Sequence, residues 1–164
     1  MRISLKTICL SLSVLLATSG ALHAQEKSPQ EMQKQCHNFA QGFYDWYVRK
    51  LNAGGDYSTA LKYKRRAFSP ELFRLIKDAR DHLSKTGDAI LDFDPIFGGS
   101  DWPKRIVAGK AKITGDRCWI NNAELMFKDG RWLFMNFYYG KDKRDDLLSI
   151  LRKQLRQERR KHSR

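Results

Sequence analysis

Residues 117–139 read RCWINNAELMFKDGRWLFMNFYY, and this stretch decides the fold. Apolar and polar residues alternate over 117–128, which predicts a strand with one buried face. The pair Asp129–Gly130 tolerates the positive φ angles of a tight hairpin turn. The segment 131–139 is apolar on both faces, which predicts a strand that is covered from two sides. Two antiparallel strands joined by a hairpin are therefore expected at the heart of a sheet.

Helices are expected before and after these strands. Ser28 and Glu31 form a capping-box pattern, and apolar residues then recur at helical spacing until about Asn52. Ser69 precedes a second helix that ends near Gly87. The remaining expected elements are a short helix at 58–66, a strand at 104–114 and a last helix from about residue 145. The order predicts an α+β fold: N-terminal helices packed on a curved antiparallel sheet, with a closing C-terminal helix.

The N-terminus has the pattern of a secretory signal peptide. Arg2 and Lys6 precede an apolar run over 8–17, and small residues follow up to Ala24. The run is too short for a stable membrane span. We expect cleavage after Ala24 or Ala21, no transmembrane anchor after cleavage, and a periplasmic or secreted protein. The alternative is an uncleaved membrane anchor.

Three segments are expected: the signal peptide at 1–24, one domain at 25–151 and a basic tail at 152–164. The formal net charge is +13, and removal of Arg2 and Lys6 leaves about +11. Such a charge indicates an anionic envelope ligand (lipid or glycan) or an acidic protein, or simply a solvated basic surface. Export disfavours nucleic acid. The basic residues of the tail are Arg152, Lys153, Arg156, Arg159, Arg160 and Lys161.

Export also changes the cysteine count. Cys9 leaves with the signal peptide, and Cys36 and Cys118 remain. An even pair in an oxidising compartment predicts a disulfide. The alternative is two separately buried thiols.

The order of elements resembles the nuclear-transport-factor-2-like, cystatin-like cone. Three motifs are similar to those of a family of exported bacterial proteins of unknown function with that proposed architecture: FYDWY at 43–47, DFDP at 92–95 with Asp101–Trp102 following, and GRWLF at 130–134. One departure is Asn136, where the resemblance implies an acid. The family has no established reaction, so the resemblance implies a fold and a compartment only.

Motifs for catalysis are absent from the sequence. It contains no nucleophile elbow, phosphate loop or dinucleotide-binding glycine pattern, and its histidines lack zinc-ligand spacing, so neither a cofactor nor a metal is predicted. In the segment 92–101, Asp94 is expected to fix a turn by accepting backbone N–H groups; a ligand-contact loop is the alternative. The ligand-binding candidates are Asp92, Asp94, Asp101, Trp102, Tyr47 and Trp46.

The sequence leaves three functions open. The first is a non-catalytic exported binding domain that uses the concave face of the sheet or the loop at 92–102. The second is an immunity or inhibitor protein against a secreted toxin or hydrolase. The third is a small enzyme with an acid in a cone-shaped pocket, for which the candidates are Asp45, Asp94 and Glu124. Glu124 is expected to point outward, on the strand face opposite Trp119. No catalytic residue is assigned.

Overall fold

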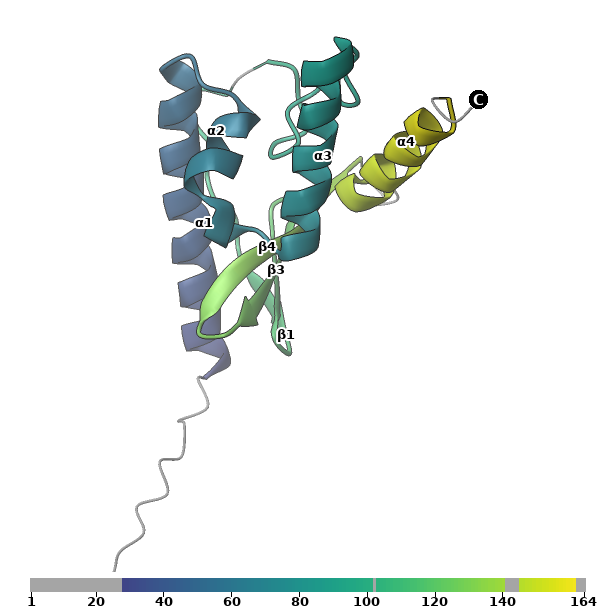
Figure 1. Cartoon of the computed structure of the whole chain (residues 1–164). Coiled ribbons are helices and arrows are strands. Elements are labelled where there is room, and N and C mark those ends of the chain that lie inside the picture. The colour runs from purple at the N-terminus through teal and green to yellow at the C-terminus, as the bar shows by residue number, and fades with distance from the viewer. Residues whose placement is uncertain (1–27, 102, 141–144, 162–164) are drawn as a thin grey trace, which may run out of the picture.

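The protein has an α+β fold in which helices precede and follow an antiparallel sheet, as predicted (Figure 1). The structure is a computed structural model that describes residues 28–101, 103–140 and 145–161. The segment 1–24, predicted to be a signal peptide, and Trp102 therefore lie outside the described residues. The elements are α1 (Pro29–Asn52), α2 (Tyr57–Tyr63), the 3₁₀ turn η1 (Arg65–Ala67), α3 (Pro70–Thr86), β1 (Lys112–Thr114), β2 (Arg117–Ile120), β3 (Ala123–Lys128), β4 (Arg131–Tyr139), β5 (Asp145–Asp146) and α4 (Leu147–Lys161).

The two long N-terminal helices begin and end as the sequence predicts. The Ser28 hydroxyl accepts the Glu31 backbone N–H at 3.2 Å, and the Ser69 hydroxyl accepts the Leu72 N–H at the same distance. Each serine thus satisfies one of the N–H groups that a helix start leaves unpaired. Gly87 ends α3 at φ 79°, a left-handed conformation that glycine adopts without steric cost.

The strands form a meander in the order β1-β2-β3-β4-β5. The predicted hairpin turn is confirmed, because Asp129 and Gly130 have φ angles of 51° and 75° between the paired residues Lys128 and Arg131. Strand β4 matches the predicted range. Its consecutive residues 132–134 are all buried, so both of its faces are covered. The edge of β4 opposite β3 contacts the start of α3, where the Ser69 N–H donates to a β4 carbonyl.

The expected strand 117–128 is wrong in one respect, because it is two strands with a turn between them. Asn121 adopts φ 51°, a conformation that asparagine tolerates better than most residues, and Ile120 then pairs with Ala123. Residues on either side of this turn therefore lie opposite each other. Trp119 faces Glu124 across the two strands and shares a sheet face with it.

The expected strand 104–114 is also mostly wrong, because only Lys112–Thr114 forms β1. The preceding residues satisfy their backbone groups with side chains instead of a neighbouring strand. The Gln41 side chain of α1 accepts the Ala108 N–H at 2.8 Å and donates to the Ile106 carbonyl at 3.2 Å. The Asn121 side chain likewise accepts the Gly109 N–H at 2.7 Å. Side-chain partners therefore hold this segment in an irregular path.

Helix α4 packs on α3, on the side away from α1 (Figure 1). Its buried residues are Leu147, Leu151 and Leu155. The Asp146 carboxylate accepts the Ser149 N–H at 3.0 Å and the Asn136 side-chain N–H at 2.8 Å. Asn136, where the resemblance implies an acid, thus joins β4 to the start of α4. The expected boundary between domain and tail, at 151/152, falls inside this helix.

Cys36 of α1 and Cys118 of β2 form the predicted disulfide, with their Cα atoms 6.6 Å apart. Both residues are fully buried. The bond joins the first helix to the sheet across 82 residues of sequence. None of the described helices is both long and apolar enough to span a bilayer.

We expect the disulfide to contribute about 4 kcal/mol to the free energy of unfolding, because it closes a long loop in the unfolded chain. The protein with Cys36→Ala and Cys118→Ala should therefore unfold at lower urea concentration than the oxidised protein. Alkylation without reductant, followed by mass measurement, checks that the two thiols are unavailable in the starting material. A difference of less than about 1 kcal/mol would contradict the expectation.

Candidate functional site

The loop at 92–101 is built around a buried carboxylate. Asp94 is only 9% exposed, and it accepts hydrogen bonds from the Tyr47 hydroxyl and from the Ile96 N–H, the latter at 2.8 Å. The Phe97 N–H lies 3.4 Å from the same oxygen as Ile96. Burial raises the pKa of Asp94, and this effect outweighs the three hydrogen bonds, which lower it. Asp94 therefore fixes the turn in the way that the sequence favours.

Further contacts anchor this loop to the end of the sheet. The Asp94 N–H donates to the Gly99 carbonyl at 3.0 Å, and the Gly98 N–H donates back to the Asp94 carbonyl at 2.8 Å. The Tyr139 hydroxyl donates to the Pro95 carbonyl. At Gly98, whose φ is 77°, a Cβ atom would lie 2.6 Å from the Tyr139 ring. The loop and β4 thus approach so closely that only glycine fits there.

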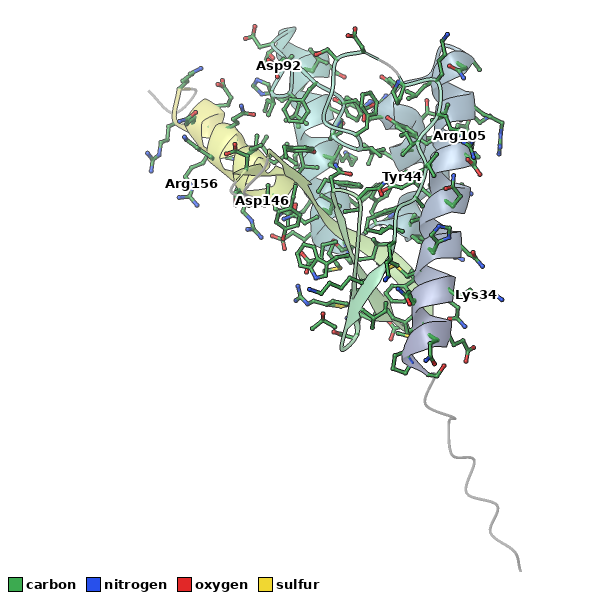
Figure 2. The ribbon with its side chains drawn as sticks, turned by 180° about the vertical axis from the view of Figure 1, so that it is seen from behind. Lys34, Tyr44, Asp92, Arg105, Asp146 and Arg156 are labelled. Carbon is green, nitrogen blue, oxygen red and sulfur yellow. A yellow bond between two sulfur atoms is a disulfide. The ribbon has the colours of Figure 1, made fainter. Side chains whose placement is uncertain are left out.

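The other candidates that the structure describes lie outside the hydrogen-bond network of Asp94. Asp92 and Asp101 are exposed, and Asp92 lies at the end of the molecule opposite the start of α1 (Figure 2). Trp46 is partly buried, with the Lys64 ammonium 5.1 Å from its ring centre. Among these candidates, the Tyr47 hydroxyl donates to Asp94, and the centres of the Trp46 and Tyr47 rings lie 6.4 Å apart. Within the described ranges, no three His, Cys, Asp or Glu residues are placed to hold a metal ion.

Glu124 is buried, so the expectation that it points outward is wrong. It is 4% exposed and accepts hydrogen bonds from Arg117 and from the Tyr138 hydroxyl, the latter at 2.8 Å. The turn at Asn121 places it opposite Trp119, whose ring lies 5.2 Å from that of Tyr138. Burial, followed by the hydrogen bond to Glu124, raises the pKa of Tyr138 to about 12. A single strand over 117–128 would put Trp119 and Glu124 on opposite faces, so this cluster could not be predicted from it.

The space between α1 and the sheet is filled by aromatic side chains. Tyr44 and Tyr47 are almost completely buried, and Tyr44 points from α1 toward the interior (Figure 2). The centres of the Phe43 and Phe134 rings are 4.8 Å apart. Burial raises the pKa of Tyr44, whose hydroxyl has no hydrogen-bond partner in the described part of the chain. These aromatic residues therefore form the core, which is the more common role of such a pattern.

A groove of about 580 Å³ lies between the start of α3 and the β3–β4 hairpin. A second groove of about 410 Å³ continues from it and shares Arg65, Arg66 and Arg131. We call the two together the basic groove. Among the described residues, its cations are Lys62, Lys64, Arg65, Arg66, Arg74, Lys77, Lys128 and Arg131, and Asp129 is the one acid that lines it. The sequence signal for it is the run KYKRR at 62–66, which was not among the predicted sites.

Helix α4 carries a second basic surface. A shallow groove of about 400 Å³ on it is lined by Ser149, Arg152, Lys153, Arg156, Gln157 and Arg160, and Arg156 projects outward (Figure 2). All six basic residues expected in the tail are exposed. Arg152 pairs with Glu71 of α3, and Lys161 pairs with Glu158 at 2.6 Å. These two pairs reduce the charge that is free to meet a ligand.

The chain matches no family model, no curated protein and no solved structure. The fold assignment therefore depends on the structure itself, and the functional assignment depends on the residues described above.

Replacing Asp94 should show how strongly it supports the loop. In Asp94→Ala the Tyr47 hydroxyl and the Ile96 N–H both lose their acceptor while buried, so we expect a loss of about 2–4 kcal/mol in the free energy of unfolding. Asp94→Asn keeps one acceptor oxygen and should lose clearly less. Urea denaturation of the two variants checks this, and equal losses would contradict it. Asp92→Ala, at an exposed position of the same loop, is the control and should unfold like the unaltered protein.

The raised pKa of Asp94 predicts how stability changes with pH. The folded protein holds this proton more tightly than the unfolded chain, whose aspartates titrate near pH ~4. The contribution of Asp94 is therefore fully present below that pH and is lost as the pH rises through the folded pKa. Between pH ~4 and pH ~7 the unaltered protein should lose stability relative to Asp94→Asn. Denaturation curves at several pH values measure the difference, and a difference that is constant with pH would refute this assignment. Asp92→Asn is the matched control.

Proposed function

We propose that this protein is an exported, non-catalytic binding domain whose ligand or partner is anionic. The observation that carries the proposal is the basic groove, which gathers eight cations and one acid around a concave surface. Opposite charge concentrated in a concavity raises the local concentration of an anionic ligand and speeds its encounter with the protein. The groove also lies on the exposed surface, where a ligand can reach it without rearrangement of the core.

The polar interior supports binding rather than catalysis. Asp94 and Glu124, two of the acids considered for an enzyme, accept hydrogen bonds from side chains and backbone groups of the protein itself. Asp45, the third, is exposed on α1 and accepts a hydrogen bond from Gln41 at 2.8 Å. A general acid needs to be within reach of a substrate in a pocket. The first two are instead used to hold a loop and a sheet face.

Export is part of the proposal and has two supports. The sequence of residues 1–24 has the pattern of a signal peptide. The disulfide between Cys36 and Cys118 suits an oxidising compartment such as the periplasm, because cytosolic thiols are kept reduced. The relation to the exported bacterial family with the nuclear-transport-factor-2-like cone belongs to the same proposal, and the α+β element order is compatible with it.

An immunity or inhibitor protein is the second candidate. The basic groove favours it as well, since an inhibitor of a secreted toxin or hydrolase needs a surface complementary to its target. The two candidates differ in what binds: a single protein at a fixed ratio indicates the inhibitor, whereas a lipid or a glycan indicates a ligand-binding domain.

Capture from an envelope extract tests the proposal. We expect the immobilised protein to retain at least one anionic component that is released by about 0.5 M NaCl, because salt screens such contacts. The variant Arg66→Glu with Arg131→Glu should lose that component. Lys153→Glu with Arg156→Glu changes the net charge equally on α4 and should retain it. Mass spectrometry, together with lipid and glycan analysis, identifies the component; equal retention by all three proteins would refute the groove as the binding site.

A further inference from the structure

We infer that the basic groove binds an extended acidic segment of a partner polypeptide, in which carboxylate side chains alternate with apolar ones. This inference rests on the proposed function and names the class of its ligand. It follows from three features of the groove: cations without partners, an apolar floor and a concave shape.

The first feature is a set of cations that have neither an ion-pair partner nor a cation–π contact in the described ranges: Arg66, Lys128 and Arg131. Lys128 and Arg131 are also direct register partners on β3 and β4, so two like charges face each other at the end of the hairpin. Such a pair destabilises a sheet unless an anion lies between the charges or beside them. Arg66 of η1 lines the same groove and adds a third positive charge.

Other cations of the groove are already engaged. Arg74 pairs with Asp78 at 3.2 Å, and Lys77 pairs with Asp81. The Arg65 guanidinium lies 5.0 Å from the centre of the Phe73 ring. The cations without such contacts, Arg66, Lys128 and Arg131, lie where η1 and the β3–β4 hairpin border the groove. A ligand carboxylate there would meet cations that need not leave another partner first.

The second feature is the apolar surface between the charges. Phe68 and Leu133 line the first groove and are buried, and Pro70 and Phe73 lie beside them. Phe39 and Trp132 line the continuation. The buried Trp132 indole N–H has no acceptor within the described residues. A ligand that carried only anionic groups would leave this surface wet, whereas apolar groups between its charges would cover it.

An extended polypeptide supplies both kinds of group with the correct alternation, because successive side chains of a strand point to opposite sides. Its carboxylates would lie toward the cations and its apolar side chains toward the floor. The third feature, concavity, disfavours a membrane, since a flat headgroup surface would contact the rim and leave the floor uncovered. The basic face of α4, whose groove is lined only by polar and charged side chains among the described residues, suits such a surface better.

Selection from a library of random peptides displayed on phage tests the inference. With the oxidised protein as bait, we expect enriched peptides to be acidic and to alternate acidic with apolar residues. The leading peptide is then labelled with fluorescein and its Kd is measured. Relative to the unaltered protein, the Kd should rise about tenfold or more for Arg66→Glu with Arg131→Glu and change by less than about twofold for Lys153→Glu with Arg156→Glu. Circular dichroism and thermal melting verify that both variants fold.

Two further probes separate the possible outcomes. Oligoglutamate with the same charge as the leading peptide should bind about tenfold or more weakly, because it cannot cover the floor. Equal binding of both would overturn the inference and leave the proposed anionic site in place. Enrichment of peptides without excess acid would overturn the inference and count against the anionic site as well. If vesicles rich in phosphatidylglycerol bind through the groove and peptides do not, the inference also fails, while the proposed anionic site remains. If no anionic probe distinguishes the groove variant from the α4 variant, the proposed function fails as well.

Discussion

The packing of α1 on the sheet is the interaction on which the rest of the structure depends. One face of this helix carries Phe43 and Tyr44 into the core against Phe134 of β4. The same helix provides Cys36, which bonds to β2, and Gln41, which substitutes for a strand neighbour along the segment before β1. One helix thus holds β2 by a covalent bond, β4 by apolar contacts and the irregular segment before β1 by polar contacts.

The sequence predicts the elements whose signals are local. Ser28 and Ser69 cap helices that start beside them, and Asp129–Gly130 turns the chain because of its own backbone preference. The errors arise where distant residues decide. The alternation over 117–128 continues through the turn at Asn121 and hides it, which also put Glu124 on the wrong face. The partners of the segment 104–111 come from α1 and from Asn121, which no window of neighbouring residues can reveal.

The candidate site divides in a similar way. Asp94 could be assigned to a turn from its place before Pro95, and the disulfide could be inferred from the cysteine count. The basic groove could not, because Arg66 and Arg131 are far apart in sequence and meet only through the contact of the start of α3 with the edge of β4. Charge is visible in a sequence, but the concavity that concentrates it depends on the fold.

The bond between Cys36 and Cys118 closes the chain between these residues into a covalent ring. Elements α2, η1 and α3 belong to this ring, and β3, β4 and α4 follow it as an open arm. The groove therefore forms between the ring and the open arm: Arg66 belongs to the ring, and Lys128 and Arg131 belong to the arm. Closing the ring does not by itself form the groove, because one side of the groove belongs to the arm. The complete groove exists only after the arm has packed on the ring, so a ligand that contacts both sides would stabilise that packing.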